Sequence, residues 1–453
     1  MSDAAAAATG KTLDPRSSAA QSDEELLDGL QRDKFRYFER EVNPANGLVD
    51  DKACQDRPEL LENWPASIAA VGVALAAYPV GVERGFMTRH EAIERTLVAL
   101  RFFWTSPHGP APDATGCRGF YYHFLDMATG RRAWRCELST IDSALLLAGA
   151  LTAGQYFDRD DEAEHEIRTL ADALYRRADW RWAQHGAATV AHGWKPENGF
   201  LRYRWRGYDE ALLLYVLGLG SPTHPLPAES YAAWCSTYRW REVYGVEYLH
   251  AGPLFTHQLP HVWVDFRGVR DAFMRDRGID YFENSRRATY VQQQHAIRNP
   301  FGFKGYGEHC WGITASDGPG WTTRRVDGVE RRFFDYVARG VPDGPDDGTL
   351  SPWAAVTSLP FAPRIVLPTI RWFDEIELRG THPYGYKATF NPTFPNGSGH
   401  AHGWISPCHF GINEGPVVLM IENHRSELLW RLMRGCPYVM TGLRRAGFTG
   451  GWL

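Results

Sequence analysis

Residues 194–215 read WKPENGFLRYRWRGYDEALLLY, and this stretch decides the fold that the sequence predicts. The first part is polar and aromatic, with three arginines and the carboxylates Glu197, Asp209 and Glu210. An apolar run over 211–219 follows directly, which predicts a helix buried on most of its sides. The stretch therefore predicts a buried helix whose N-terminal turn carries acids and opens on an aromatic loop.

Other parts of the chain repeat this arrangement. Residues 65–78 are small and apolar, a helix that begins at Ser139 or Thr140 carries Asp142 in its first turn, and a last buried helix is expected over about 415–433. Amphipathic stretches lie between them, at about 23–41, 88–104, 158–179 and 280–299. Ser22 with Glu25, and Thr88 with Glu91, have the spacing of capping boxes. Buried and amphipathic helices thus alternate along the chain.

The alternation predicts an all-α fold of roughly twelve paired helices. Residues 22–453 show no linker, and we expect one domain there, after an Ala- and Ser-rich segment over 1–21 that is predicted to be disordered. The pattern favours a closed (α/α) toroid, with loops and small strand pairs around a central cleft. An open solenoid and two bundles are the alternatives, and the lack of a fixed repeat period disfavours a regular solenoid.

Composition excludes several classes of protein. The net charge is −5 and no basic cluster is present, which disfavours nucleic acid as a partner. No apolar run approaches the ~20 residues of a membrane span. The first 21 residues lack the apolar core of a secretory signal. We therefore expect a cytoplasmic protein, or a periplasmic one if an export signal lies outside this sequence. The oligomeric state stays open.

The seven cysteines are scattered, odd in number and without a CxxC pair. This pattern predicts neither a disulfide framework nor a zinc site, and we expect most of the cysteines to be reduced and buried.

Aromatic residues make up 13% of the chain, including 17 Trp, and many stand beside Gly, Pro, Asp or His. Aromatic rings stack on the apolar faces of sugars, arginines bond hydroxyls in fixed geometry, and a pair of carboxyl groups can cleave an acetal. This combination favours a carbohydrate site. Four loop aromatics are candidates for sugar platforms or for packing: Trp194, Tyr208, Trp321 and Trp404.

The acids at helix starts are the candidates for catalysis. Glu210 is interpreted as a general acid with a raised pKa, or as a carboxylate that the helix dipole favours. Asp142 has the same two readings, whereas Glu137 precedes the cap and is a candidate for substrate binding only. Glu414 is either functional or a surface loop acid. Glu422, in an apolar helix, is expected either to pair with an arginine, which is the preferred reading, or to line the cavity.

Arg206 and Arg267 are expected either to bind sugar hydroxyls or to pair with Asp209 and Asp265, and Asp209 itself could orient Glu210 or bind a sugar. His257, His261 and Asp265 stand four residues apart, which would place them on one face of a helix. With this spacing, the three side chains could form a polar surface that contacts a sugar, or they could form hydrogen bonds with one another and their neighbours inside the protein core. Pro260 interrupts the run and no HExxH is present, so we predict no metal and no cofactor.

Several segments resemble the glucoamylase-like family, whose characterised members include the endo-β-1,2-glucanases of glycoside hydrolase family 144. They cover almost the whole chain from about residue 24. The acids Asp50, Glu283 and Asp317 lie within matching segments and become candidates for substrate binding. The matching segments are 46–50 (NGLVD), 139–146 (STIDSALL), 207–211 (GYDEA), 252–258 (GPLFTHQ), 261–268 (HVWVDFRG), 281–285 (YFENS), 311–319 (WGITASDGP), 347–352 (DGTLSP) and 415–423 (GPVVLMIEN).

The resemblance implies an (α/α)6 fold and an inverting mechanism without a metal, with Glu210 in the position of the general acid. The family's candidate base is an Asp in a Gly-Ile-Asp-Gln-Gly-Pro run just before the last helix. This chain has Asn413 and Glu414 there, and an Asn cannot accept a proton at neutral pH. Either Glu414 serves as the base, or another acid such as Asp142 does, or the route differs.

The expected activity is hydrolysis of a β-glucan, for which a linear or cyclic β-1,2-glucan is the preferred substrate. Two alternatives stay open. One is a different reaction in the same cleft, namely phosphorolysis, transglycosylation or α-glucan hydrolysis. The other is a non-catalytic glycan-binding protein that keeps the aromatic residues and tolerates loss of the acids.

Overall fold

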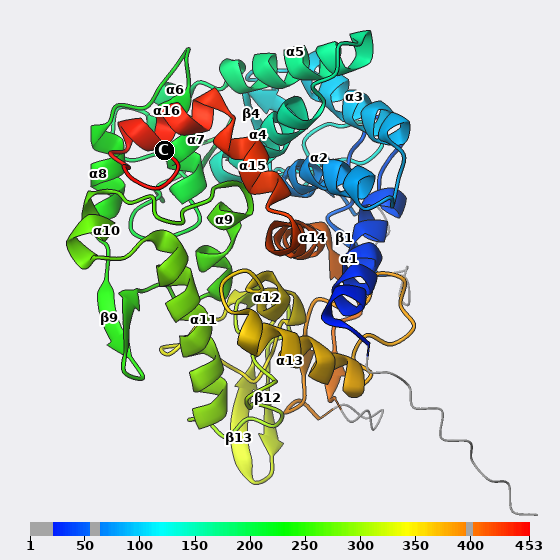
Figure 1. Cartoon of the computed structure of the whole chain (residues 1–453), viewed down its shortest axis with the longest axis vertical. Coiled ribbons are helices and arrows are strands. Elements are labelled where there is room, and N and C mark those ends of the chain that lie inside the picture. The colour runs from blue at the N-terminus through cyan, green and yellow to red at the C-terminus, as the bar shows by residue number, and fades with distance from the viewer. Residues whose placement is uncertain (1–20, 55–63, 396–401) are drawn as a thin grey trace, which may run out of the picture.

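The computed structural model describes residues 21–54, 64–395 and 402–453. The expectation of disorder over residues 1–21 lies almost entirely outside these ranges. The described chain is mainly helical, with short strands in small sheets (Figure 1). None of its helices is both long and apolar enough to cross a membrane.

The innermost helices contact one another in a closed circuit. Helix α2 contacts α4, α4 contacts α7, α7 contacts α9, α9 contacts α14, and α14 contacts α2, while α12 packs against α14. These helices are apolar on nearly every side, and every residue of α7 is buried. Their bounds are Ile68–Glu83 (α2), Thr140–Tyr156 (α4), Leu212–Gly220 (α7), Leu259–Trp263 (α9), Pro352–Thr357 (α12) and Gly411–Arg425 (α14).

Helices α2 and α4 approach each other most closely at two glycines. A Cβ atom added to Gly149 would lie 1.9 Å from the carbonyl oxygen of Gly72, and one added to Gly72 would lie 2.4 Å from that of Leu145. No side chain fits between the two backbones at this crossing. The small residues that the sequence places in these helices therefore permit the tight inner packing.

Amphipathic helices cover the inner ones from outside. Helix α1 packs on α14, α3 on α2 and α5, α5 on α4, and α16 on α7. Ser22 with Glu25 and Thr88 with Glu91 form the predicted capping boxes, and Ser139 caps α4. These helices are α1 (Asp23–Arg40), α3 (Arg89–Thr105), α5 (Glu162–Arg177), α6 (Trp180–Gln184), α8 (Glu229–Cys235), α10 (Ala272–Arg277), α11 (Tyr281–Arg298), α13 (Pro363–Glu375), α15 (Leu428–Arg434) and α16 (Pro437–Arg445).

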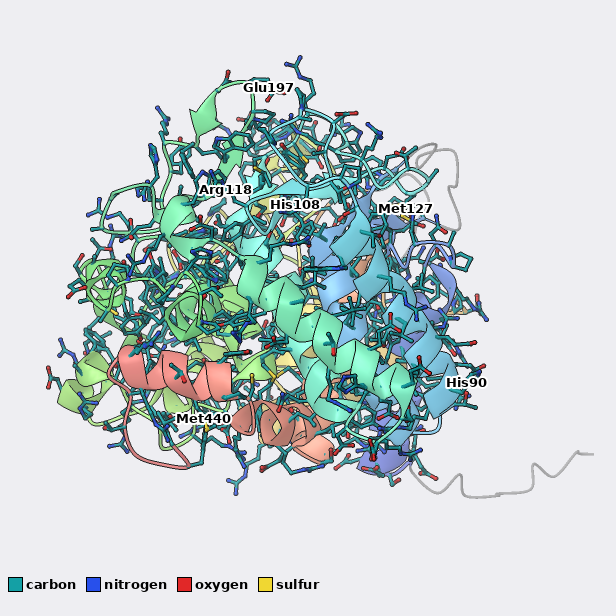
Figure 2. All side chains as sticks on the ribbon, turned by 90° about the horizontal axis from the view of Figure 1, so that it is seen from above. His90, His108, Arg118, Met127, Glu197 and Met440 are labelled. Carbon is teal, nitrogen blue, oxygen red and sulfur yellow. A yellow bond between two sulfur atoms is a disulfide. The ribbon has the colours of Figure 1, made fainter. Side chains whose placement is uncertain are left out.

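Loops and strands gather at one end of the helices. Figure 2 shows His108, Met127 and Glu197 on loops at this end, and His90 and Met440 toward the other end. The two-stranded sheets are β1–β17, β2–β5, β9–β10, β11–β14, β12–β13 and β15–β16. Their bounds are β1 (Lys52–Ala53), β2 (Ala66–Ser67), β5 (Phe124–Leu125), β9 (Trp240–Val243), β10 (Val246–Leu249), β11 (Ala315–Ser316), β12 (Thr322–Val326), β13 (Val329–Phe333), β14 (Val337–Ala338), β15 (Phe390–Asn391), β16 (Trp404–Ile405) and β17 (His409–Phe410).

The largest sheet exceeds the strand pairs that the sequence predicted. It has five antiparallel strands in the order β3-β4-β6-β7-β8. It joins segments from both sides of α4 and α5, so local sequence patterns did not indicate it. The strands are β3 (Gly116–Cys117), β4 (Phe120–Tyr122), β6 (Leu138–Ser139), β7 (Gly193–Lys195) and β8 (Gly199–Phe200).

Two predicted helices differ from the structure. The last buried helix, α14, begins at Gly411 and ends at Arg425, and α15 and α16 follow it. Residues 257–265 do not form one helix, because the 3-10 helix Leu254–His257 and helix α9 are separate and Asp265 lies beyond both. Pro260 stands in the first turn of α9, which explains the interruption.

The cysteine prediction is wrong at one pair. Cys54 and Cys408 form a disulfide across 354 residues of sequence. Pairing of β1 with β17 brings the two segments together, and a contact of this kind is invisible in Cys spacing. Cys117, Cys136, Cys310 and Cys436 are free and buried, as expected, and Cys235 is partly exposed.

A buried ion pair holds the segment after β13, and its loss should cost much stability. Arg339 and Asp347 are fully buried, and the guanidinium donates from Nε and Nη2 to the two carboxylate oxygens, each at 2.8 Å. We expect Arg339→Met to lower the free energy of unfolding by about 3–5 kcal/mol, since Asp347 would stay buried without its partner. Urea denaturation measures this change.

The matched control is Arg101→Gln, which breaks an exposed bidentate pair with Glu166. Pairs at the surface contribute about 0–1 kcal/mol. Equal losses in the two variants would contradict the role assigned to burial.

Candidate active site

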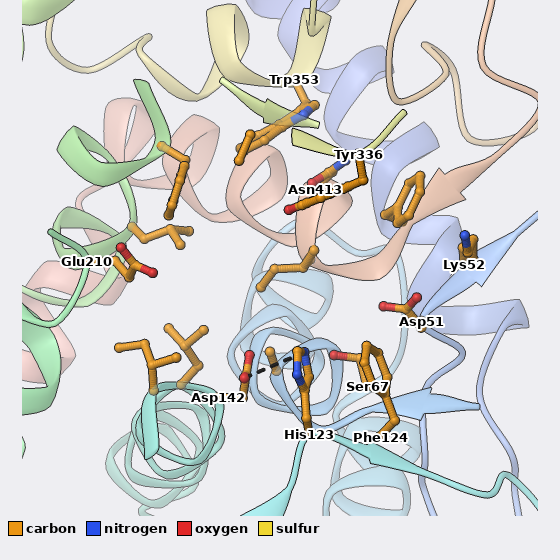
Figure 3. Close-up of a pocket in the computed structure, with 18 of the residues that line it drawn as sticks. Asp51, Lys52, Ser67, His123, Phe124, Asp142, Glu210, Tyr336, Trp353 and Asn413 are labelled. Carbon is orange, nitrogen blue, oxygen red and sulfur yellow. Dashed lines mark ion pairs between the residues drawn. The ribbon is translucent and has the colours of Figure 1, made fainter. Parts of the chain in front are cut away.

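A cavity of about 480 Å³ opens at the end of the molecule where the inner helices begin (Figure 3). Six helices each contribute a residue from their first turn or from just before it. The residues that line the cavity are Asp51, Lys52, Trp64, Ser67, Ala69, His123, Phe124, Trp134, Ile141, Asp142, Leu145, Glu210, Phe255, Leu259, Ala315, Tyr336, Trp353, Phe410, Ile412 and Asn413. The cavity is therefore built from segments spread over the whole chain.

Glu210 lies in the turn before α7 and faces this cavity. Burial, with a contribution from the negative charge of Asp142, raises the pKa of Glu210 to about 7. Asp209 beside it accepts hydrogen bonds from Trp234 Nε1 at 2.9 Å and from the Ala211 amide at 3.1 Å. These bonds hold the turn that presents Glu210, and Asp209 itself does not line the cavity.

Asp142 lies in the first turn of α4, and it lines the same cavity as Glu210. Its carboxylate accepts a hydrogen bond from the Ser139 hydroxyl and lies 3.6 Å from His123 Nε2. His123 Nδ1 in turn lies 3.0 Å from the carboxylate of Glu137. Glu137 thus contacts His123 of the cavity wall but does not itself line the cavity.

Asp51 and Lys52 form another side of the cavity (Figure 3). The Asp51 carboxylate accepts a hydrogen bond from Trp64 Nε1 at 3.0 Å, and burial raises its pKa. The Lys52 ammonium lies 3.8 Å from the centre of the Trp64 ring and 5.0 Å from that of Phe410. A carboxyl group, a cation and aromatic faces thus stand together away from Glu210.

Aromatic rings cover much of the remaining wall. Trp64 and Trp134 meet edge to face with centroids 4.7 Å apart, and Trp134 is 54% exposed. Tyr336 is 63% exposed yet borders the cavity, and Trp353, which also lines it, is buried. Exposed rings at the rim of an acidic cavity suit the apolar faces of sugar rings.

The aromatic platforms predicted from the sequence lie elsewhere. Trp194 packs against Trp182, and buried Tyr208 packs against Tyr281 and His257. Trp321 is 69% exposed and contacts Phe334, and Trp404 is part of β16. None of these four side chains lines the cavity.

Glu414 is also absent from the cavity wall. It is buried, with one carboxylate oxygen 2.7 Å from the Lys34 ammonium and the other 3.1 Å from His409 Nδ1. Burial raises its pKa to about 7, although Lys34 opposes this rise. The preceding residue, Asn413, lines the cavity instead. The predicted partnership of Glu422 is confirmed, because Arg84 binds its two oxygens at 2.7 and 2.8 Å.

The predicted histidine face is part of the protein core. Buried His261 contacts the Ser285 hydroxyl at 3.0 Å, and buried His257 lies 3.3 Å from the Ala251 carbonyl oxygen. Burial lowers the pKa of each histidine to about 3, so both are neutral. Asp265 pairs with Arg267 at 2.8 Å and with Arg434.

The other candidates lie outside the cavity wall too. Glu283 binds Arg286 and Arg287 on α11, and Arg206 is exposed on its loop. Asp317 accepts hydrogen bonds from Thr389 and Ser406. Asp50 accepts one from Tyr37 through its backbone oxygen, and burial raises the pKa of its carboxyl to about 7.

Several polar residues of the cavity were missed by the sequence analysis, Asp51 and His123 among them. Asp51 follows the predicted Asp50, and only the pairing of β1 with β17 decides which of the two faces inward. His123 stands between β4 and β5, where the sequence analysis singled out no residue. Neither position had a motif of its own. In the described ranges, no group of three or more His, Cys, Asp or Glu is placed to hold a metal ion.

A protein-family model described as "Putative glucoamylase" matches residues 202–437, which is more than half of the 453 residues. The chain belongs to this family. A solved structure of a putative glucoamylase from Bacteroides uniformis is 32% identical and has a TM-score of 0.83. That match covers 96% of this chain and all of the other.

Two similar proteins carry more specific names. The endo-β-1,2-glucanase of Chitinophaga pinensis, solved with sophorotriose and glucose, is 26% identical with a TM-score of 0.84, over 96% of this chain and all of the other. An exo-β-1,2-glucooligosaccharide sophorohydrolase of Parabacteroides distasonis is 27% identical over 94% of this chain. The present chain spans 58% of that relative's length. Both named activities are hydrolysis of β-1,2-linked glucans.

Proposed function

We propose that this protein is a glycoside hydrolase that cleaves β-1,2-glucan, with Glu210 as general acid. The observation that carries the proposal is the placement of Glu210 and Asp142 on one aromatic-walled cavity, with a Glu210 pKa of about 7. A glycosidase needs a protonated carboxyl group and an ionised one on either side of the bond that it breaks. The names of two family relatives support the β-1,2 linkage.

Asp142 is the proposed general base. Of the two candidates near the end of the chain, Asn413 reaches the cavity but cannot accept a proton, and Glu414 is engaged by Lys34 behind the wall. Asp142 reaches the cavity, and His123 Nε2, on the same wall, lies 3.6 Å from its side-chain oxygen. In the proposed step, Asp142 takes a proton from water, the water oxygen bonds to the anomeric carbon, and Glu210 protonates the departing oxygen.

Several finer points belong to the same proposal. We infer that the closed circuit of inner helices and its outer layer form an (α/α)6 toroid, and that residues 22–453 make one catalytic domain. The reaction would invert the anomeric centre, which requires carboxyl groups about 6.5–9.5 Å apart to leave room for water. Asp51, Lys52 and the rim aromatics would bind the glucan.

The pH dependence follows from the pKa of Glu210. A general acid acts in its protonated form, and burial raises the pKa of this group to about 7. We therefore expect kcat/KM to be lost as the pH rises through about 7, with about a tenfold fall for each further pH unit. Initial rates on β-1,2-glucan between pH 4 and 9 measure this fall, which is the alkaline limb of the pH profile. A rate that holds steady to pH 9 would remove Glu210 as the acid.

Product chromatography tests the function itself. The purified protein is incubated with linear and cyclic β-1,2-glucans, and with β-1,3- and α-1,4-glucans as controls, each with and without phosphate. We expect short oligosaccharides from the β-1,2-glucans alone, at a rate independent of phosphate. Glycosyl phosphates would indicate phosphorolysis, and binding without any product would indicate a glycan-binding protein.

A further inference from the structure

His123 stands between two carboxylates, one at the cavity wall and one behind it. Its Nδ1 lies 3.0 Å from Glu137. Its Nε2 lies 3.6 Å from Asp142, and Figure 3 marks this second pair. The ring stacks on Phe124 with centroids 4.0 Å apart and planes only 12° from parallel. The imidazole is therefore fixed in its plane, with each nitrogen directed at an acid.

This geometry suits the imidazolium form of His123. An ionised carboxylate only accepts hydrogen bonds, and a neutral imidazole has one nitrogen that cannot donate. A protonated ring has one N–H for the hydrogen bond to Glu137 and a second that faces Asp142 at ion-pair distance. Burial alone would lower the pKa of His123, but Asp142 and Glu137 together outweigh it and raise the pKa to about 9. The His123 contact in turn lowers the pKa of Glu137 to about 2.

Few other charges face this group. Asp51 adds a third negative charge near His123, and Lys52 lies beside Asp51. Lys195 of β7 acts on Glu137 from the outer side. The negative charges next to the ring thus outnumber the positive ones, and this balance favours a cation at His123.

We propose that His123, held as an imidazolium by Glu137, is a positioning residue that orients the Asp142 side chain at the cavity wall. The proposal rests on the role of Asp142 as base in the proposed function. His123 keeps its proton throughout: the proton of the attacking water goes to Asp142, and the leaving oxygen takes its proton from Glu210. Glu137 acts only through His123.

The first test is the pH profile of His123→Asn, which keeps a polar side chain but removes the cation. A neighbouring opposite charge shifts the titration of a carboxyl group by about 1–3 pH units. We therefore expect the acidic limb of the kcat/KM profile to move to higher pH by about one unit. The alkaline limb, which is assigned to Glu210, should stay at the same pH. His90→Asn is the matched control, because His90 forms an exposed pair with Glu94 on α3. It should leave both limbs unchanged.

The second test reads the charge of His123 without any substrate. Histidine-selective NMR, with the His123 signal assigned by its loss in His123→Asn, should show a protonated ring from pH 5 to 8. In Glu137→Gln the ring should lose its proton at a pH at least about one unit lower. If His123→Asn does not fold, Glu137→Gln supplies both the assignment and the pH profile.

The two tests separate this inference from the proposed function. A neutral His123 at pH 7, or an acidic limb that stays in place in active His123→Asn, would overturn the inference alone. A protein that cleaves no glucan would overturn the proposed function. In that case, a protonated His123 ring that loses its proton at lower pH in Glu137→Gln would still support the set of contacts from Glu137 through His123 to Asp142.

Discussion

Glu210→Gln is expected to lower kcat on β-1,2-glucan by about 10²–10⁴-fold, the contribution typical of a general acid. The amide has nearly the shape of the protonated acid but cannot supply a proton to the leaving oxygen. Because Asp209, rather than Glu210, accepts the bonds that hold the turn before α7, the variant should keep its fold and its melting temperature. Stopped assays of reducing ends measure the rate.

The leaving group provides a sharper test of the same role. An aryl β-sophoroside with a nitrophenolate leaving group needs little protonation, so Glu210→Gln should lose far less activity on it than on the glucan. Glu166→Gln is the control, since it removes a carboxylate from an exposed pair with Arg101 on the outer layer. Equal losses on both substrates would indicate a structural defect instead of a missing acid.

Asp142→Asn is expected to lower kcat by a similar factor of about 10²–10⁴, because the attacking water would lose its base. Azide needs no deprotonation, so in place of the attacking water it should form a glycosyl azide. An inverting enzyme would give the α-azide from a β-linked glucan. Rescue by azide in Asp142→Asn, and its absence in Glu210→Gln, would assign the two roles separately.

Glu414→Gln distinguishes Asp142 from the other candidate for the base. Glu414 neutralises Lys34 behind the cavity wall, and a buried ammonium without its partner is destabilising. The variant should therefore melt at a lower temperature and keep most of its kcat where it is folded. A loss of kcat as large as that of Asp142→Asn, without a loss of stability, would return the role of base to Glu414.

The sequence predicted the helical layers well because their signals are local. The apolar runs of α2, α4 and α7 and the capping boxes at Ser22 and Thr88 depend on residues a few positions apart. Glu210 and Asp142 were found for the same reason, since each stands at the start of a buried helix. The first turns of the inner helices meet at one cavity. This arrangement agrees with the predicted alternation of buried and amphipathic helices.

The remaining features depend on contacts between distant parts of the chain. Lys34 and Glu414 are 380 positions apart, so the sequence could not indicate that Glu414 faces away from the cavity. Pairing of β1 with β17 places Asp51 at the wall and joins Cys54 to Cys408. His123 lies in a short strand segment whose partners come from elsewhere, and its two acids become neighbours only in the folded chain.

We propose that Glu210 and Asp142 hydrolyse β-1,2-glucan in this cavity with inversion. The most direct measurement is ¹H NMR of the purified protein acting on linear β-1,2-glucan, recorded before the released ends mutarotate. We expect the α-anomer of the new reducing end to appear first, and we expect neither Glu210→Gln nor Asp142→Asn to produce it. Release of the β-anomer first, or no cleavage of this glucan by the unaltered protein, would rule out the proposed mechanism.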